Sequence, residues 1–295
     1  MSPPLFISMP GNDAMAAHLV VRSGGILVPL DVHTFPDGEV RPRLMQDVAG
    51  HSIALVCTLD HPDEKFLPLV FTAAAARELG ARKVGLVAPY LGYMRQDKRF
   101  HPGEALTSRT FAALISGSFD WLVTVDPHLH RTRSLAELYS IPALALHAGP
   151  ALSEWVKANV TRPFFIGPDE ESRQWVADVA KQCSAPFAVM HKERRGDRTI
   201  RILAGDLLLP DDATPVLLDD IVSSGATAIE TIHLIKNVSR HAPIVLAIHG
   251  VFANGTEQAI LDAGATLVTS TTIPGRAAAV EVDGLIAFAI ADLMR

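Results

Sequence analysis

The sequence is short of the residues on which several classes of protein depend. Among 295 residues there are two cysteines, Cys57 and Cys183, each in or near an apolar segment. Two isolated cysteines exclude a disulfide framework and a cysteine-rich zinc site, and they indicate a reducing compartment. No apolar run reaches the ~18 residues of a transmembrane helix, and the first residues lack the charged start and apolar stretch of a signal peptide. We therefore expect a cytoplasmic protein without a membrane span.

Excess positive charge is missing as well. The chain carries 26 lysines and arginines against 32 aspartates and glutamates, which gives a formal net charge of −6. A general nucleic-acid binder needs a broad basic surface, so we expect no nucleic-acid partner. The chain also lacks the G-x-x-x-x-G-K-[S/T] string of P-loop kinases. Any anionic ligand must therefore be held by a few local basic residues.

What the chain does contain is a regular alternation of strand-like and helix-like segments. Short apolar runs, among them SIALVCT, KVGLVAPY and PIVLAIHG, alternate with helical spacing at 66–79, 106–115, 172–179 and 226–235. Strands that alternate with helices predict mainly parallel sheets flanked by helices, and nearly all-apolar strands suit sheets that are buried on both faces. The fold class is therefore α/β.

The length of the chain suits two domains better than one. The alternation pauses at a stretch with proline and glycine, residues 141–150, and this pause predicts a boundary near residue 148. The expected domains are residues 1–148 and 149–295. The last predicted helix, 283–294, could pack on either half, and the sequence leaves that open.

The most informative segment is 216–227, with the sequence VLLDDIVSSGAT. It predicts an apolar strand, two carboxylates (Asp219 and Asp220) at the strand tip, and a loop of small residues that leads into a helix. Adjacent carboxylates can accept hydrogen bonds from neighbouring sugar hydroxyls or help to hold a hydrated Mg²⁺. Hydroxyl and backbone N–H groups at a helix N-terminus form a ready anion site. A phosphorylated sugar fits this pattern, and an acid-rich turn without a ligand would give the same residues.

Two further segments suit the recognition of a nucleotide. Residues 35–39, FPDGE, predict a turn that carries an aromatic ring and two carboxylates. Residues 89–109 follow strand KVGLVA at the edge where open α/β sheets bind ligands. In an otherwise acidic protein this loop gathers four cations, Arg95, Lys98, Arg99 and Arg109. A guanidinium binds phosphate oxygens in pairs. Each segment also has a plain interpretation, as an exposed turn and as a solvated basic loop.

Three more strand ends carry candidate ligands. His128 follows strand WLVTVD, close to Asp126, where a metal ion or a nucleotide phosphate could be reached. Asp169 follows strand FFIG and a proline. Residues 191–197, HKERRGD, follow strand FAVM and predict either a mobile basic flap or a plain exposed hairpin.

In this order, the motifs resemble those of ribose-phosphate diphosphokinases, also called PRPP synthetases. The Y-x-R-Q-D string at 93–97 is among the most specific of them, and QDKRFHPGEALTSR at 96–109 is similar to the short, archaeal-type (class III) enzymes. The resemblance covers nearly the whole chain. It implies two phosphoribosyltransferase-type domains, the first for ATP and the second for ribose 5-phosphate and the product, PRPP.

The resemblance also implies a reaction. The β,γ-diphosphoryl group of ATP passes to the C1 hydroxyl of D-ribose 5-phosphate, and AMP leaves. The implied cofactor is Mg²⁺, and the implied substrates are ATP and ribose 5-phosphate. Members of the family assemble, so a homo-oligomer is expected.

Each role is carried over by position in the matching motif. The catalytic residues on the flap would be Lys192 and Arg194. The residues in contact with ATP would be Phe35, Asp37, Glu39, Arg95, Gln96, Asp97 and His128. The metal ion would be held by His128 and Asp169. The sugar phosphate would be held by Asp219, Asp220, Ser223, Ser224, Gly225, Ala226 and Thr227.

The chain departs from the family pattern in three places. At Ser223 and Ser224 it differs from the long bacterial form and is closer to the S-T-G-G-T version of the short enzymes. Glu170 and Glu171 follow Asp169 where small glycines are usual, and they suit the acid-rich first turn of a helix better than a ligand role. In the segment 270–274, STTIP, Thr271 replaces the usual Asp or Asn.

Two other functions stay open at this point. A non-catalytic relative of PRPP synthetase, serving as a regulatory subunit, would share most of the motifs. A phosphoribosyltransferase that consumes PRPP would share 216–227, but it would not need the segments 35–39 and 95–97 and would usually end after one domain.

Overall fold

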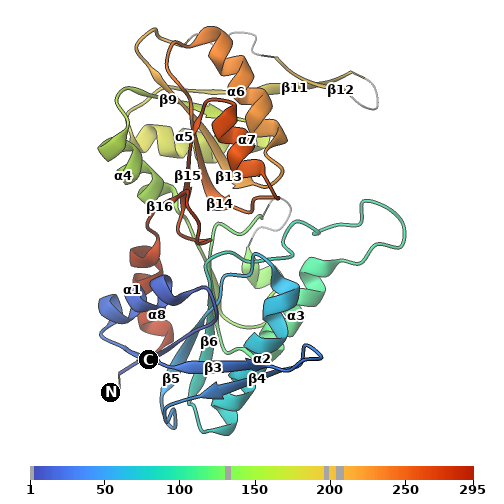
Figure 1. Cartoon of the computed structure of the whole chain (residues 1–295), viewed down its shortest axis with the longest axis vertical. Helices are drawn as coiled ribbons and strands as arrows, with labels where there is room; N and C mark the ends of the chain where they lie inside the picture. Colours follow the sequence, from blue (N-terminus) through green and yellow to red (C-terminus); the bar gives the residue numbers. More distant parts are fainter. Residues whose placement is uncertain (1–2, 130–133, 196–198, 204–208) are drawn as a thin grey trace. The chain divides into compact units, whose positions relative to one another are not determined.

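The computed structural model describes residues 3–129, 134–195, 199–203 and 209–295; between 191 and 208 it describes the backbone of two strands without their side chains. The chain divides into two compact units (Figure 1). Residues 1–147 and 282–295 form the first, and residues 148–281 form the second. Each unit has one parallel sheet with helices on both faces, which confirms the predicted α/β class. Within the described residues, no helix has the length and apolar character needed to cross a bilayer.

In the first unit, six parallel strands lie in the order β2-β1-β5-β6-β7-β8. They are β1 (Leu5–Ser8), β2 (Ile26–Val28), β5 (Ser52–Val56), β6 (Lys83–Ala88), β7 (Leu122–Val125) and β8 (Ala143–Leu146). The α-helices are α1 (Asp13–Ser23), α2 (Pro62–Glu78), α3 (Thr107–Ser118) and α8 (Asp283–Leu293), with a 3₁₀ turn, η1 (Leu135–Glu137). Helices α1 and α8 cover one face of the sheet, and α2 and α3 cover the other (Figure 1).

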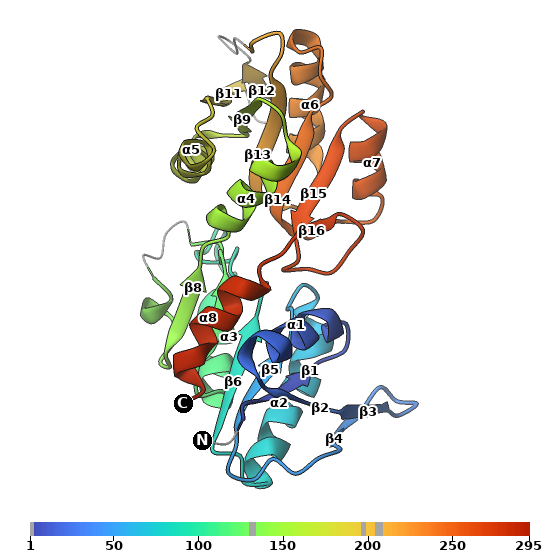
Figure 2. The same ribbon diagram turned by 90° about the vertical axis from the view of Figure 1, so that its left-hand side faces the viewer.

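In the second unit, the parallel strands lie in the order β10-β9-β13-β14-β15-β16. They are β9 (Pro163–Gly167), β10 (Phe187–Val189), β13 (Thr214–Val222), β14 (Ile244–Gly250), β15 (Thr266–Ser270) and β16 (Ala278–Val280). The helices are α4 (Gly149–Asn159), α5 (Arg173–Gln182), α6 (Ala226–Val238) and α7 (Thr256–Asp262), with a 3₁₀ turn, η2 (Glu170–Ser172). Figure 2 shows α5 and α7 on opposite sides of this sheet.

Two antiparallel hairpins stand apart from the sheets. Strands β3 (Leu30–Thr34) and β4 (Val40–Leu44) pair in the first unit, and β11 (His191–Arg195) and β12 (Thr199–Leu203) pair in the second. The β3–β4 hairpin extends away from the six-stranded sheet of its unit (Figure 2). Its tip holds the FPDGE segment.

The composition of the strands explains why the sheets are buried and where ligands can reach them. Every residue of β5 and β7 is buried, as expected for strands that are covered on both faces. Each unit has its own apolar core, around Ile53, Leu55 and Leu86 in the first and Ile166 and Leu217 in the second. Because all strands of a sheet run the same way, the loops after their carboxyl ends gather at one edge.

The C-terminal helix α8 belongs to the first unit. It packs beside α1 and against β7 and β8. Asp283, in the first turn of α8, is buried and accepts a hydrogen bond from the guanidinium of Arg22 on α1. Residues 282–295, placed above with the domain 149–295, therefore pack with the first unit, because the mostly apolar α8 completes the helical layer over that sheet.

We predict that Gly85→Ala destabilises the first unit. Gly85 lies in β6 against the indole of Trp121, and an added Cβ would fall 1.8 Å from Trp121 Cε2. Overpacking of this kind costs about 1–3 kcal/mol. Urea unfolding followed by tryptophan fluorescence should show a lower midpoint than for the wild type.

The matched control is Gly117→Ala, on an exposed position of α3 where an added Cβ meets nothing within 4 Å. Alanine is favoured over glycine inside a helix by up to ~1 kcal/mol, so this variant should be neutral or more stable. Equal midpoints for Gly85→Ala and the wild type would contradict the packing argument.

Candidate active site

Carboxylates from two neighbouring strands meet at the carboxyl edge of the second sheet. Strands β9 and β13 pair in parallel, with Ile166 opposite Leu217. Asp169 follows β9, and Asp219 and Asp220 lie near the end of β13. All three carboxylate side chains are half-buried, and the charge of Asp169 acts on Asp219. The sheet thus brings Asp169 next to the Asp219–Asp220 pair.

The pKa of Asp219 is raised well above its usual value. Burial is the largest cause, and interactions with Asp220 and then the charge of Asp169 add to it. The pair is also tied to the backbone: the N–H of Asp220 donates to Asp219 Oδ1 (3.0 Å), and the N–H of Ile221 donates to Asp220 Oδ1 (2.8 Å). Like charges held this close favour a ligand that supplies positive charge or hydroxyl donors.

Residues 223–227, which we call the anion loop, connect these acids to helix α6. Gly225 has φ of 72°, in the left-handed region that favours glycine, and α6 begins at the next residue, Ala226. The N–H of Ile229 donates to the carbonyl of Gly225 (2.8 Å), so the helical hydrogen bonds begin there. The N–H groups before Ile229 have no partner further back in the helix. They belong to the same short segment as the hydroxyls of Ser223, Ser224 and Thr227, and these are the kinds of donor that an anion site uses.

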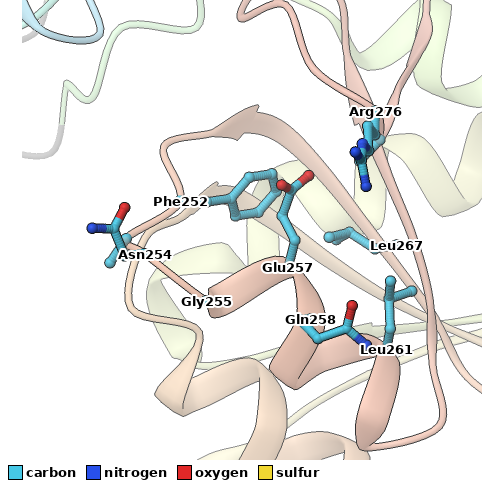
Figure 3. Close-up of a pocket in the computed structure, with 10 residues that line it drawn as sticks. Phe252, Asn254, Gly255, Glu257, Gln258, Leu261, Leu267 and Arg276 are labelled. Atoms are coloured by element: carbon cyan, nitrogen blue, oxygen red, sulfur yellow. The ribbon is translucent and has the colours of Figure 1, made fainter.

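The segment after β14 supports the anion loop. The N–H of Ala253 donates to the carbonyl of Ser223 (3.1 Å), and a Cβ added at Gly225 would lie 2.7 Å from Thr256 Cγ2. A cavity of about 470 Å³ adjoins this support (Figure 3). It is lined by Phe252, Ala253, Asn254, Gly255, Glu257, Gln258, Leu261, Leu267, Arg276 and Ala277. The cavity thus lies next to the segment that supports the anion loop, in a region that the sequence motifs did not indicate.

Asp169 also shapes the chain that follows it. Its Oδ1 accepts a hydrogen bond from the N–H of Ser172 (3.3 Å), and its carbonyl accepts one from Ser172 Oγ (2.6 Å). Glu170 and Glu171 form the exposed turn η2, and Glu170 pairs with Arg173. The extra acids thus belong to the turn before α5, and Glu170 is directed at a cation one turn further on.

The segment 270–274 is anchored by buried hydroxyls. Ser270 Oγ and Thr272 Oγ1 donate to the carbonyl of Ile248, at 2.7 and 3.0 Å. The buried ring of His249 contacts Thr272 Oγ1 through Nδ1 (2.8 Å). The sequence motifs did not indicate His249, which lies inside an apolar strand. These contacts connect the ends of β14 and β15 at the edge where Asp219 lies.

In the first unit, the FPDGE segment forms the exposed tip of the β3–β4 hairpin. The N–H of Phe35 donates to the carbonyl of Glu39 (2.8 Å), and the N–H of Glu39 donates to Asp37 Oδ1 (3.1 Å). The ring of Phe35 is 40% exposed and meets the ring of His33 edge-on, with centroids 4.6 Å apart. The aromatic ring and both carboxylates are therefore exposed, outside the core of their own unit.

The loops after β6 and β7 leave from the same edge of the first sheet. The β6 loop carries Arg95, which is exposed, and Gln96 and Asp97, which are half-buried. The β7 loop carries His128, which is half-buried. The first unit thus gathers these four predicted ATP residues on neighbouring loops, whereas the FPDGE tip lies on a separate hairpin.

Asp126 is paired with a histidine that the sequence motifs did not indicate. Its backbone has φ of 34°, an uncommon conformation for a non-glycine residue, and its Oδ1 lies 2.9 Å from Nδ1 of His147. His147 follows β8, the neighbour of β7. The hydrogen bond to Asp126 raises the pKa of His147, so the pair ties the loop of His128 to the adjacent strand end.

The other predicted residues are the two flap cations, Lys192 and Arg194, and the two metal ligands, His128 and Asp169. Lys192 and Arg194 lie on β11, opposite Ile202 and Ile200 of β12, and their side chains are outside the described part of the chain. The predicted metal ligand His128 belongs to the first unit and Asp169 to the second. No group of three or more His, Cys, Asp or Glu side chains among the described residues converges as a metal site.

Two protein families and several enzymes of known name are similar to this chain in sequence. The family described as the N-terminal domain of ribose phosphate pyrophosphokinase matches residues 5–118, and the phosphoribosyl transferase domain family matches residues 134–282. A ribose-phosphate pyrophosphokinase of Saccharolobus solfataricus is 30% identical over 84% of this chain and 85% of its own. That of Thermoplasma acidophilum is 27% identical over 92% of both chains.

The fold has a close counterpart among solved structures. The crystal structure of phosphoribosylpyrophosphate synthetase from Mycobacterium smegmatis superposes with a TM-score of 0.85 over 99% of each chain, at 20% identity. At that identity the likeness concerns the fold, in which both units and their order are shared. Together with the matched domains and the relatives above, it leads to one conclusion: the chain belongs to the ribose-phosphate pyrophosphokinase family of enzymes.

Proposed function

We propose that this enzyme transfers the β,γ-diphosphoryl group of ATP to the C1 hydroxyl of D-ribose 5-phosphate, giving PRPP and AMP. The observation that carries the proposal is the carboxyl edge of the second sheet, where Asp219, Asp220 and the anion loop adjoin. A sugar that carries both a diol and a phosphate complements a carboxylate pair beside an open helix N-terminus. Family membership supports the same reaction.

The second unit would hold ribose 5-phosphate. Asp219 and Asp220 accept hydrogen bonds from the ring hydroxyls, which are neutral donors and so relieve the crowding of negative charge. The anion loop binds the 5-phosphate through its N–H and hydroxyl groups. The sugar is thereby fixed at both ends, and its C1 hydroxyl is held in place for attack on the β-phosphorus.

The first unit would hold ATP. Phe35 offers a ring for stacking on the base, and Asp37 and Glu39 can accept hydrogen bonds from its exocyclic amine. Arg95, with Gln96, Asp97 and His128 on neighbouring loops, faces the nucleotide and its phosphates. In a chain of net charge −6 this local cation supplies attraction that the overall charge does not.

Magnesium fits the donor set at the acidic edge. Mg²⁺ takes hard oxygen ligands, commonly one or two carboxylates completed by substrate phosphates, and a divalent cation would relieve the repulsion at Asp219. We propose that Asp169 contributes a carboxylate to this ion; His128 is proposed as a ligand from its place in the D-x-H motif alone. When bound, the ion would neutralise charge on the phosphate oxygens.

The flap, residues 191–197, would act on the transferred group. Lys192 and Arg194 stabilise the negative charge that moves onto the bridging oxygen as AMP departs, since this chemistry depends on positioning and charge more than on covalent help. A cationic strand pair over the phosphates also keeps water from the reacting group, which suppresses hydrolysis of ATP.

Assembly and compartment complete the proposal. We propose that the enzyme is a homo-oligomer, because the FPDGE tip exposes its ring and carboxylates outside the core of its own unit. We place it in the cytoplasm, which supplies ATP and keeps thiols reduced, in keeping with the free cysteines Cys57 and Cys183.

The match of residues 5–118 to the N-terminal pyrophosphokinase domain favours this enzyme over a phosphoribosyltransferase.

The direct test mixes the purified protein with ATP, Mg²⁺ and ribose 5-phosphate and follows AMP by chromatography. AMP should form together with PRPP, and omission of the sugar should abolish it. AMP or ADP at the same rate without the sugar would identify a hydrolase instead. No turnover with both substrates would favour the non-catalytic alternative.

We predict that Lys192→Ala lowers kcat by on the order of 10²-fold, the usual scale for loss of a charge contact in the transition state. The KM for ribose 5-phosphate should change little, because that substrate is held by the anion loop. The matched control is Lys157→Ala on the exposed side of α4, which should retain wild-type kcat. A near-normal kcat for Lys192→Ala would remove this residue from the mechanism.

We predict that Asp219→Asn stabilises the free protein while it weakens substrate binding. Because the pKa of Asp219 is raised in the folded state, folding loses stability as pH rises from the usual carboxyl range through that raised pKa. Near neutral pH and without metal, the variant should therefore melt at a higher Tm, by about 2–4 °C for each kcal/mol of relieved repulsion. The difference should shrink as the pH falls to about 3, below the ordinary Asp pKa of about 3.9, where the carboxyl is mostly protonated in both states.

The same variant should raise the KM for ribose 5-phosphate by on the order of 10-fold, the scale for a lost charge-assisted hydrogen bond. Calorimetric melts and steady-state kinetics measure the two effects separately. A lower Tm at neutral pH would show that Asp219 stabilises the fold and would refute the repulsion argument.

A further inference from the structure

The loop between β6 and α3 is organised around one carboxylate, that of Glu104. Its Oε2 accepts hydrogen bonds from the N–H of Phe100 (2.7 Å), the N–H of His101 (3.1 Å) and Nε2 of Gln96 (3.1 Å). Its Oε1 lies 2.7 Å from Nδ1 of His101. Four contacts to one side chain replace the regular hydrogen bonds that this loop lacks.

The backbone around Glu104 closes the loop further. The carbonyl of Glu104 accepts a hydrogen bond from Nε of Arg99 (2.9 Å), and Nε2 of Gln96 also donates to the carbonyl of Lys98 (3.2 Å). The N–H of Ser108, in the first turn of α3, donates to the carbonyl of Gln96 (3.4 Å). Gln96 is therefore held by both its amide group and its backbone.

The other end of the loop is anchored by Tyr93. Its backbone has φ of 63°, rare for a residue with a bulky side chain. Its ring packs against Phe111 on α3, with centroids 4.9 Å apart, and its hydroxyl donates to Asp63 on α2. Tyr93 and Glu104 thus fix the chain on either side of Arg95 and Gln96.

Within the described residues, Arg95 itself forms no hydrogen bond or ion pair, and it is exposed. Hydrogen bonds hold the loop around Arg95 in shape, and the guanidinium of Arg95 is available to bind a ligand. The contacts of Glu104, that with His101 foremost, lower the pKa of its carboxyl, so the group keeps its charge and its acceptors.

We propose that Glu104 is a positioning residue for ATP: it holds the loop that presents Arg95 and Gln96, so that ATP binds a preformed surface. The inference rests on the proposed function, since it assumes that these two residues meet the nucleotide. A loop that is ordered before binding loses less conformational freedom when the ligand arrives, and this difference is expressed in affinity.

The test compares Glu104→Ala with the wild type in steady-state kinetics of AMP formation, with each substrate varied in turn. The KM for ATP should rise by on the order of 10-fold, from the loss of several hydrogen bonds to a charged acceptor. The KM for ribose 5-phosphate should stay within about 2-fold, because that substrate is bound by the other unit.

Two further variants separate positioning from general stability. Glu104→Gln keeps one oxygen that can accept from the N–H groups and should give a smaller rise in the KM for ATP. Glu78→Gln removes an exposed acid at the end of α2, away from this loop, and should leave both KM values unchanged. A calorimetric melt of each variant shows whether it folds; if Glu104→Ala does not, Glu104→Gln decides the question.

The outcomes are distinct. A wild type that forms AMP, with an unchanged KM for ATP in a folded Glu104→Ala, overturns this inference and leaves the proposed function standing. Equal rises in both KM values overturn it as well, because they indicate a general structural role. A wild type that forms no AMP refutes the proposed function itself.

Discussion

The parallel pairing of β9 with β13 is the constraint on which the acidic site depends. It brings the residue after one strand, Asp169, against a residue near the end of the next, Asp219, although the two are far apart along the chain. The consequence is a group of half-buried carboxylates in which burial first, and the neighbouring Asp220 and Asp169 second, raise the pKa of Asp219. Such an arrangement opposes folding slightly, and it is best explained by ligands that compensate the charge, as strained or repulsive groups in enzymes often are.

The two units share one architecture, but the loops at the sheet edge carry acidic side chains in the second unit and a basic side chain in the first. In each, the loops after parallel strands gather at one edge, and the side chains on those loops set the ligand. The second unit places acids beside an open helix N-terminus, whereas the first places a guanidinium on a loop that Glu104 and Tyr93 hold in shape. An acidic chain can in this way offer a phosphorylated ligand attraction that is local, on loops whose shape is held by hydrogen bonds.

Local pattern predicted the α/β class and the strand, acid pair, loop and helix at 216–227, since each of these depends on neighbours along the chain. Contacts over longer distances were not predictable. The pairing of Asp126 with His147 depends on the register of β7 and β8, and the burial of His249 depends on Thr272 from the next strand. Helix α8 packs on the part of the first sheet that α1 leaves uncovered. The spacing of apolar residues within α8 does not show which sheet it covers.

Local sequence is enough to predict which chemical groups are available and which of them lie at strand ends: the acids of β13, the small residues of the anion loop, and the cations of the β6 loop. Backbone propensity and the spacing of apolar residues suffice for that, because they act over a few residues. Which of these groups lie next to one another depends on tertiary packing. Asp169 became a neighbour of Asp219, and Glu104 became the centre of its loop, because strand register and hydrogen-bond geometry are set by packing across the whole unit.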